Sequence, residues 1–428
     1  MVKRSYAHVR HVFLFLFSLA VLSGVVASDA HATNGYFANG YSVESKGLAG
    51  AGVALPQGSL DAAVNPAAMA FVGNRLDFGL SFFNPNREYT VTGNPSGFPG
   101  TFGLTPGTFE SGKKWFVIPS IGVNWQLDEK NSIGISIYGN GGMNTNYDQA
   151  AFYGSSPTGV DLSQLFFAPT YARKIGNNKH ALAITPIFAY QSFEGKGLQS
   201  FAGYSSDPAH LTNNDHDSSY GFGGRIGYMG EILPNLNLGA AYQTKIYMSR
   251  LDSYRGLFAE QGDFDIPATW TIGLAFKATP DLAFLLDVQQ IYYSDVASIN
   301  NPLLPNIQTS QLGNDDGAGF GWEDITVLKL GVQWKSSKEW TWRAGYSIGG
   351  QPIPDSEVLF NIIAPGVIEQ HATVGCTRTF GNQEVKLAIM HAFSNSVTGP
   401  NPLEAPGQQA IEIKMNQWEF TVGYTWKF

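Results

Sequence analysis

The sequence is poor in cysteine, in charged residues and in long apolar runs. Its 428 residues include a single cysteine, Cys376, so neither an intramolecular disulfide nor a cysteine-based metal cluster can form. Charged residues make up 14% of the chain, against roughly 25% in an ordinary soluble protein. Beyond the N-terminus, no stretch reaches the roughly 18 consecutive apolar residues that a membrane-spanning helix needs. These absences argue against a helical membrane bundle, and the aromatic content of 13% excludes an intrinsically disordered chain.

What the sequence does contain is glycine, 49 residues, and an alternation of apolar with small or polar residues after about residue 75. Such alternation places successive side chains on opposite faces of a β-strand. In the stretch 115–127, for example, Val117 and Ile121 share one face and Ser120 and Asn124 the other. Fourteen such stretches are predicted, an even number as bacterial single-chain barrels require. They begin near residues 75, 115, 132, 163, 181, 220, 236, 266, 282, 325, 340, 371, 384 and 416.

The connections between these strands alternate between short polar turns and long segments. Six short turns, such as 128–131, lie between seven long connections, of which 294–323 is the longest. A soluble β-sandwich has no reason to sort its loops by side, whereas outer-membrane barrels have short periplasmic turns and long extracellular loops. We therefore expect an all-β fold, a 14-stranded antiparallel transmembrane β-barrel over residues 75–428 in the bacterial outer membrane.

The N-terminus predicts export from the cytoplasm. A basic stretch with Lys3 and Arg4 precedes the apolar run 12–26, and Ala30-His31-Ala32 is a typical cleavage site. We therefore interpret residues 1–32 as a signal peptide. The formal net charge of −8 makes nucleic acid a poor partner for such an exported protein.

The cost of burying charge decides which strand face meets lipid. A charged side chain on the lipid face costs roughly 2 to 4 kcal/mol at the bilayer midplane. Charged residues on the less apolar face are therefore expected to point into the lumen: Arg225, Lys245, Asp287, Lys329, Arg343, Lys386 and Glu419. Tryptophans near the short turns or the chain end are expected to form an interfacial girdle: Trp125, Trp334, Trp340 and Trp426. The terminal aromatic Phe428 resembles the signal by which outer-membrane barrels are recognised, so the barrel-assembly machinery is an expected partner.

Residues 33–74 do not alternate, and a segment of this kind could fold back into the lumen as a plug. It is rich in glycine and alanine, contains Lys46-Gly47-Leu48-Ala49-Gly50-Ala51-Gly52, and carries Asn65-Pro66-Ala67 near its end. With the fourteen-strand pattern that follows, the chain resembles the FadL family of outer-membrane transporters for long-chain fatty acids and other hydrophobic compounds. The resemblance covers essentially the whole exported chain. It implies that residues 33–74 form a hatch and that Asn65, Pro66 and Ala67 contribute to its gating.

The resemblance also implies an opening in the barrel wall. In the family the third strand is kinked inward and opens the wall sideways. Here the third strand runs into Gly139, Asn140, Gly141 and Gly142, where the glycines would permit an interruption of the ladder. The alternative is that these glycines merely begin a loop.

A docking groove between the loops after strands five and seven is a further implication of the resemblance. The apolar residues of these loops are the expected substrate contacts, although they could instead pack the loops together. They are Leu198, Phe201, Tyr204 and Leu211 in the first loop, and Leu251, Tyr254, Leu257 and Phe258 in the second. A further apolar run at 358–363 either widens the docking surface or covers the barrel mouth.

The expected function is passive uptake of hydrophobic molecules, such as fatty acids or hydrocarbons, by groove capture, hatch gating and lateral exit. It needs no cofactor or metal, and we expect a monomer surrounded by outer-membrane lipid. The main alternative is a general diffusion porin for polar solutes, although porins usually have sixteen or more strands.

Two further patterns match the residue types of a catalytic or a metal site, but their context argues against either role. Gly345-Tyr346-Ser347-Ile348-Gly349 matches G-x-S-x-G, yet a nucleophile elbow requires a strand-to-helix turn and this motif lies on a predicted strand. An enzyme is therefore not expected. His210 and His216 lie among aspartates in the loop after strand five, where the spacing matches no known metal site and a solvated polar loop is favoured.

Overall fold

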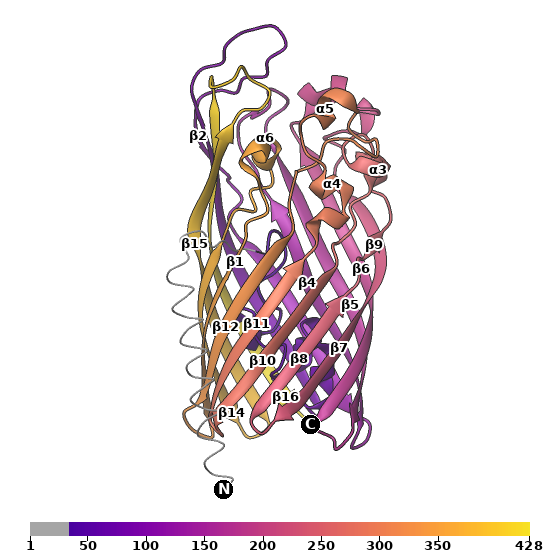
Figure 1. Cartoon of the computed structure of the whole chain (residues 1–428), viewed down its shortest axis with the longest axis vertical. Helices are drawn as coiled ribbons and strands as arrows, with labels where there is room; N and C mark the ends of the chain where they lie inside the picture. Colours follow the sequence, from indigo (N-terminus) through magenta and orange to yellow (C-terminus); the bar gives the residue numbers. More distant parts are fainter. Residues whose placement is uncertain (1–33) are drawn as a thin grey trace.

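Strands with one apolar and one polar or small-residue face close on themselves into an antiparallel barrel (Figure 1). The structure, a computed structural model, describes residues 34–428, so the expected signal peptide at 1–32 lies outside the described residues. The last strand pairs with the first from Arg75 opposite Lys427 to Thr92 opposite Ala410, which closes the ring. Two of the sixteen strands, β2 and β9, are short additions, which leaves fourteen in the wall.

The wall strands agree with the expected fourteen. The largest difference in a starting point is at the last strand, expected from about 416 and found from Ala410. The strands are β1 (Arg75–Thr92), β2 (Gly107–Glu110), β3 (Phe116–Gln126), β4 (Asn131–Asn144), β5 (Gly159–Ile175), β6 (His180–Lys196), β7 (Asp217–Leu233), β8 (Leu236–Gln243), β9 (Tyr247–Met248), β10 (Thr269–Thr279), β11 (Leu282–Ile291), β12 (Ile325–Lys335), β13 (Trp340–Gly349), β14 (Gln370–Phe380), β15 (Gln383–Pro400) and β16 (Ala410–Lys427).

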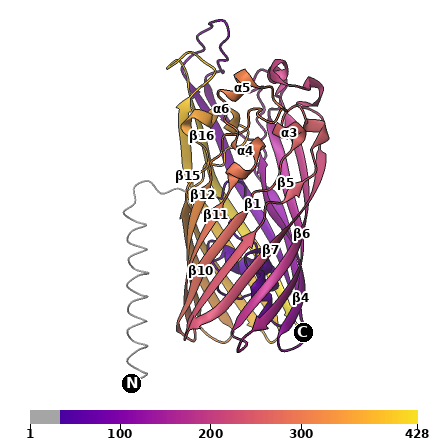
Figure 2. The same cartoon turned by 45° about the vertical axis from the view of Figure 1, so that its right-hand side comes forward.

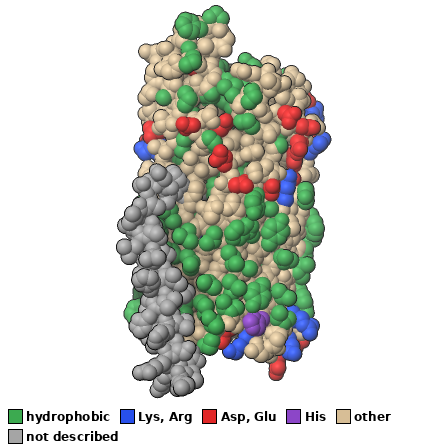
Figure 3. Space-filling model, in the orientation of Figure 1, with side chains coloured by type: hydrophobic (Ala, Val, Ile, Leu, Met, Phe, Trp, Pro, Cys, Tyr) green, Lys and Arg blue, Asp and Glu red, His purple; other side chains and the backbone are tan. Residues whose placement is uncertain are grey.

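The outside of the barrel is apolar around its middle. On the face shown in Figure 3, hydrophobic side chains form a belt, with charged side chains, mostly acidic, above it and charged side chains of both signs at the lower rim. Of the four expected girdle tryptophans, Trp125, Trp334 and Trp426 are exposed. Trp340 is half-buried because its ring stacks on Trp342. Among the described residues, the helices are all too short or too polar to span a membrane.

The inside of the barrel holds the charged residues expected there, with one exception. Arg225, Asp287, Lys329, Lys386 and Glu419 are buried, and Arg343 is half-buried with hydrogen bonds to Gln57, Gln333 and Thr377. Lys245 was expected on a lumen-facing strand position, but it follows the end of β8 and pairs with Asp265 of the same connection at 2.9 Å. The strand ends at Gln243, so the alternation extrapolated beyond it is wrong for Lys245.

The N-terminal segment, residues 34–74, lies inside the ring of strands (Figures 1 and 2). It contains helix α2 (Val43–Lys46) and two 3-10 helices, Ser59–Ala63 and Pro66–Ala70. Glycines in the wall permit its close approach: a Cβ on Gly239 would lie 2.0 Å from the Val53 carbonyl oxygen, and one on Gly345 2.2 Å from the Leu48 carbonyl carbon. Gly345 of the G-x-S-x-G motif is therefore a packing residue within strand β13.

The long connections fold over one end of the barrel and share a large hydrophobic cluster with the upper lumen. They carry short helices, namely α3 (Ala259–Gly262), α4 (Ala297–Asn300), α5 (Asn306–Thr309) and α6 (Val358–Asn361), and the 3-10 helices Gln199–Tyr204, Pro208–His210, Asp252–Tyr254, Tyr293–Asp295 and Asp355–Glu357. We call this assembly of connections the loop cap.

Candidate substrate-binding cavity and wall opening

The ladder between β3 and β4 ends early, and this parts the barrel wall. These strands pair only from Gln126 opposite Ser132 to Ser120 opposite Tyr138, whereas β4 continues to Asn144 and stays paired with β5. The register of the β4–β5 pair shifts between Gly139 and Gly141, which makes Asn140 the extra residue of a bulge. A bulge bends its strand and disrupts the local ladder. The four residues 139–142 therefore lie within a strand, at the free edge of the wall, rather than at the start of a loop.

The N-terminal segment covers this free edge from inside. The Ala38 backbone N–H donates to the Asn140 carbonyl at 3.0 Å, and the Gly142 N–H donates to the Tyr36 carbonyl at 3.0 Å. Phe37 and Gly141 thus form an isolated antiparallel bridge. A Cβ on Gly141 would lie 2.1 Å from the Tyr36 carbonyl oxygen, so the approach requires glycine. Residues 36–38 take the place that β3 leaves vacant.

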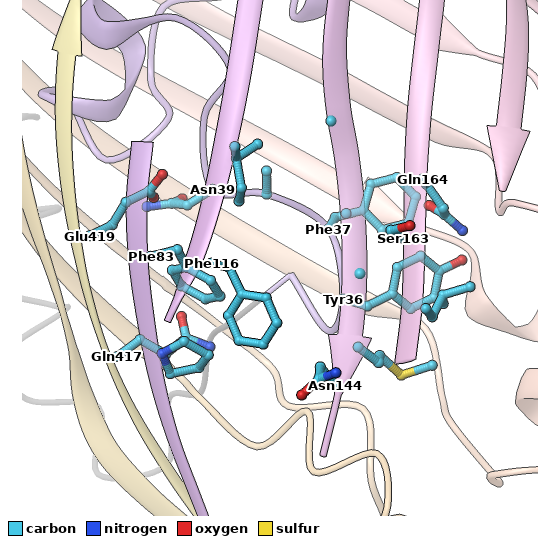
Figure 4. Close-up of a pocket in the computed structure, with 18 of the residues that line it drawn as sticks. Tyr36, Phe37, Asn39, Phe83, Phe116, Asn144, Ser163, Gln164, Gln417 and Glu419 are labelled. Atoms are coloured by element: carbon cyan, nitrogen blue, oxygen red, sulfur yellow. The ribbon is translucent and has the colours of Figure 1, made fainter. Parts of the chain in front are cut away.

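A cavity of about 490 Å³ lies at the opening. This volume is within the range of small-molecule sites, roughly 300 to 1,000 Å³. Phe83 and Phe116 line one side of the cavity, and Tyr36 and Phe37 line the other (Figure 4). The lining also includes Val117, which is 61% exposed on the outer face of β3. The cavity therefore extends from the N-terminal segment through the wall to the outer surface of the barrel.

The predicted loop residues come together, but not as an open groove. Leu198, Phe201, Leu211, Leu257 and Phe258 surround a small apolar cavity of about 30 Å³ within the loop cap. Leu251 and Tyr254 are also buried in the hydrophobic cluster of the cap, whereas Tyr204 is 50% exposed. In this structure most of the eight side chains form the interior of the cap, and contact with a ligand there requires the cap to open.

The apolar run 358–363 belongs to the same cluster. The Phe360 ring lies 5.2 Å from that of Phe201 across the cap, and Val358, Leu359 and Ile362 are fully buried. The run therefore covers the barrel mouth and contributes to the cap interior.

The Asn65-Pro66-Ala67 stretch is a buried anchor away from the large cavity. The Asn65 side-chain oxygen caps the 3-10 helix by accepting from the Ala67 N–H at 3.0 Å. Its amide nitrogen donates to the carbonyls of Val53 at 2.7 Å and Tyr228 at 2.8 Å. One residue thus joins the helix end, the middle of the N-terminal segment and strand β7. None of the three residues lines the 490 Å³ cavity.

Buried charges attach the N-terminal segment to the wall. Glu44 of α2 pairs with Lys386 of β15, which also pairs with Asp77 of β1 at 2.9 Å. Lys46 pairs with Glu419 of β16. On the other side of the lumen, the Asp287 carboxylate accepts from the Gly52 and Val53 backbone N–H groups at 2.7 and 2.9 Å. These contacts fix residues 44–53, whereas residues 36–38 touch β4 through a single bridge.

The polar groups outside the barrel show no metal centre. His210 pairs with Asp207 at 2.9 Å, and Arg255 donates to the same carboxylate at 2.7 Å. These hydrogen bonds, led by that of His210, lower the pKa of Asp207. Within residues 34–428, no group of three or more His, Cys, Asp or Glu side chains is arranged to hold a metal ion. The side chain of His210 is 34% exposed and that of His216 is 51% exposed.

Several cavity residues escaped the sequence reasoning, namely Tyr36, Phe37, Phe83, Arg87 and Phe116. Phe83 and Phe116 belong to alternating strands and gave no signal beyond that of wall residues. The pairing of residues 36–38 with β4 joins positions about a hundred residues apart. No local pattern encodes such a contact.

Comparison with known proteins identifies relatives that share this architecture. A family model described as outer membrane protein transport protein (OMPP1/FadL/TodX) matches residues 24–428. Among curated proteins, no sequence matches the chain significantly. The crystal structure of the Pseudomonas putida toluene transporter TodX is similar over 91% of this chain and 99% of its own, with a TM-score of 0.67 and 19% identity.

Two further solved structures share the fold. A Pseudomonas aeruginosa FadL homologue has a TM-score of 0.69 and 16% identity, over 92% of this chain and 100% of its own. The Ralstonia pickettii toluene transporter TbuX has a TM-score of 0.62 and 16% identity, over 91% of this chain and 99% of its own. The fourteen-stranded barrel and the match over nearly the whole chain show that this protein belongs to the FadL/TodX family of outer-membrane transporters of hydrophobic compounds.

Proposed function

We propose that this chain takes up hydrophobic molecules and releases them sideways through the opening between β3 and β4, with residues 36–38 as the movable cover. The observation that carries the proposal is the 490 Å³ cavity, which reaches the outer surface of the wall and is closed on the lumen side by the bridge between Phe37 and Gly141. Lateral release delivers an apolar molecule into lipid without a passage through water.

The energies are compatible with such a gate. The cover is held to β4 by two backbone hydrogen bonds, each worth about 1 kcal/mol net. Burial of ten methylene groups yields a gross gain of about 8 kcal/mol, before the costs of association are subtracted. Displacement of the cover also separates the buried Tyr36 and Phe37 from their aromatic neighbours Tyr293 and Trp322. An apolar ligand that replaces these ring contacts can offset the cost of the displacement.

The other elements have distinct parts in this proposal. The loop cap, including Leu198, Phe201 and Phe258, captures the ligand when it opens and passes it to the cavity below. Residues 44–53 stay attached to the wall through Glu44, Lys46 and the contacts to Asp287, so that the movement is confined to the first residues of the segment. Asn65 holds the far end of the segment on β7. The lumen-filling segment thus serves as a hatch of which only one end moves.

Crosslinking the cover to the wall tests the proposal. In a Cys376→Ser background, Ala38→Cys and Asn140→Cys place thiols on opposed residues of the bridge. We expect the oxidised protein to lose uptake of radiolabelled hexadecanoate and toluene in Gram-negative cells that lack other family members. The reduced protein, at equal surface abundance, is the matched control and should retain uptake. Uptake by the fully oxidised protein at the rate of the reduced form would refute this route.

The diffusion porin remains the alternative to be tested separately. Single-channel recording of the wild-type protein in planar bilayers should show no large steady ion currents, because residues 34–74 occupy the lumen. Large currents that persist in the crosslinked protein would favour an open polar pore.

A further inference from the structure

One charged side chain at the cavity has no counter-ion. Arg87 points inward from β1, is 2% exposed and lines the 490 Å³ cavity. Its terminal nitrogens donate to neutral acceptors: the Pro85 carbonyl, the Lys113 carbonyl at 2.7 Å, the Ser111 hydroxyl at 3.1 Å and the Asn144 side-chain oxygen at 3.2 Å. The buried Nε has no hydrogen-bond partner. Among the described residues, no carboxylate lies within 4.0 Å of this guanidinium.

The other charges that line the cavity are paired. Lys46 forms an ion pair with Glu419, and Asp161 forms one with Lys113 at 2.7 Å. The guanidinium of Arg87 therefore lies beside apolar surface without an ion-pair partner of its own, and the Asp161 charge that acts on it at longer range is shared with Lys113. A buried charge without a partner is costly, and a guanidinium matches a carboxylate in both charge and geometry.

The surroundings of Arg87 suit an amphiphile. The Phe116 ring centroid lies 5.8 Å from the Arg87 Cζ, and Phe83, Phe116 and Met143 continue the apolar lining. Asn144, a hydrogen-bond partner of Arg87, is seen beside the same cavity in Figure 4. A carboxylate that replaces one of the neutral acceptors of Arg87 would leave an attached apolar chain to extend along these side chains.

We propose that Arg87 is a specificity residue, by which the cavity favours lipophiles that carry a carboxylate over neutral lipophiles of the same size. The proposal rests on the proposed function, because it names the substrate class of the same cavity. It also distinguishes this chain from a transporter of neutral aromatic molecules such as toluene.

Paired ligands test the proposal by direct binding. Hexadecanoate and hexadecanol share a chain and differ in charge, and their affinities are measured with purified protein in nanodiscs. We expect Arg87→Met to weaken hexadecanoate binding about ten- to hundredfold, because a charge-assisted hydrogen bond is lost. Hexadecanol binding should stay unchanged. Arg87→Lys keeps the charge but not the planar fork, and it should lose less hexadecanoate affinity than Arg87→Met.

Controls separate recognition from folding. Arg378→Met removes another guanidinium, one that packs on Trp340 and Phe380 rather than at the cavity, and should change neither affinity. The heat-dependent electrophoretic mobility shift verifies that each variant forms a barrel. An equal loss of affinity for both ligands in Arg87→Met would show that Arg87 has a structural role only. Unchanged affinity for hexadecanoate would show that Arg87 has no role in binding. Either result overturns the proposal. Failure of the proposed function is a different outcome, namely wild-type protein that binds these ligands in nanodiscs but transports neither in cells.

Discussion

Individual residues decide how closely the chain packs inside the barrel and which charges it tolerates there. Gly239, Gly345 and Gly141 allow backbone-to-backbone approaches that any side chain would block. Charges are accepted in the lumen where a partner is supplied, as Glu44 supplies one for Lys386. Arg225 is likewise buried with neutral acceptors only, but Arg87 also lines the 490 Å³ cavity, and for that reason it is the residue most informative about the ligand.

The raised pKa of Asp263 in the loop cap leads us to predict that the stability of the folded protein depends on pH. Burial, and next the charge of Asp265, raise the pKa of Asp263 to about 8. The folded protein therefore keeps a proton that the unfolded chain loses near pH 4, so stability falls as the pH rises from about 4 to 8. We expect Asp263→Asn to raise the thermal unfolding temperature at pH 8.5 and to have little effect at pH 4.5, as measured by tryptophan fluorescence.

The neighbouring carboxylate provides the control for this measurement. Asp265 pairs with Lys245 at 2.9 Å, so Asp265→Asn removes this ion pair together with the repulsion between Asp265 and Asp263. It should lower the unfolding temperature at pH 8.5. An Asp263→Asn variant with the same stabilisation at both pH values would contradict the assigned titration.

At the scale of elements, the N-terminal segment has one part held by charged contacts and one part held by uncharged contacts. Three of its contacts with the wall are charged or charge-assisted, through Glu44, Lys46 and the Asp287 carboxylate. Residues 36–38 are held by the bridge to β4, by a hydrogen bond from the Tyr36 N–H to the Tyr293 hydroxyl at 3.3 Å, and by ring contacts with Trp322. None of these contacts is an ion pair, and an apolar ligand can replace the ring contacts. Local opening at this end therefore does not require release of the whole segment.

Asp287 is expected to hold the middle of the segment in place. Asp287→Ala removes the acceptor of two backbone N–H groups, and hydrogen bonds to charged groups are worth about 1.5 to 3 kcal/mol each. We expect the amides of residues 48–55 to exchange at least tenfold faster in hydrogen–deuterium exchange. Asp287→Asn, which keeps an acceptor oxygen, should show a smaller effect.

A second variant tests whether the effect is local. Thr326→Ala removes a hydrogen bond to Gln290 between exposed positions of β12 and β11, and should leave the exchange of residues 48–55 unchanged. Equal exchange in Asp287→Ala and wild type would show that other contacts hold this part of the segment.

Sequence alone predicts the strands well because lipid and lumen impose opposite chemistry on alternate residues. That constraint ends where a strand leaves the bilayer. For this reason the alternation wrongly predicts a strand position for Lys245, and it predicts too late a start for the last strand. The early end of the β3–β4 ladder depends on which partner each strand meets, and the bridge at Phe37 joins distant positions. The apolar loop residues were expected to share a surface, and they do, but their neighbours in the loop cap bury it.

At the scale of the whole molecule, the chain end completes the barrel. Lys427 of β16 lies opposite Arg75 of β1 in the strand ladder, and the Phe428 N–H donates to the Asn74 carbonyl at 3.3 Å. The Phe428 ring is 47% exposed, so it contributes little to packing in the finished protein. Recognition of Phe428 by the barrel-assembly machinery is our proposal, and it would act before the barrel closes.

Phe428→Ala should therefore reduce assembly and spare stability. We expect several-fold less folded protein in the outer-membrane fraction, while purified refolded protein unfolds within a few degrees of wild type. Phe380→Ala is the matched control, because Phe380 is an aromatic residue of the same exposure, 47%, at a neighbouring turn. Equal amounts of folded protein for both variants in cells would argue against a recognition signal at Phe428.

The lengths of two ladders have a mechanical consequence. The seam between β1 and β16 joins eighteen residue pairs, whereas β3 and β4, close by around the ring, share seven. The ladders on either side of this short one are longer, with nine pairs between β1 and β3 and thirteen between β4 and β5. The wall can thus part between β3 and β4 without loosening the eighteen-pair seam that keeps the cylinder closed.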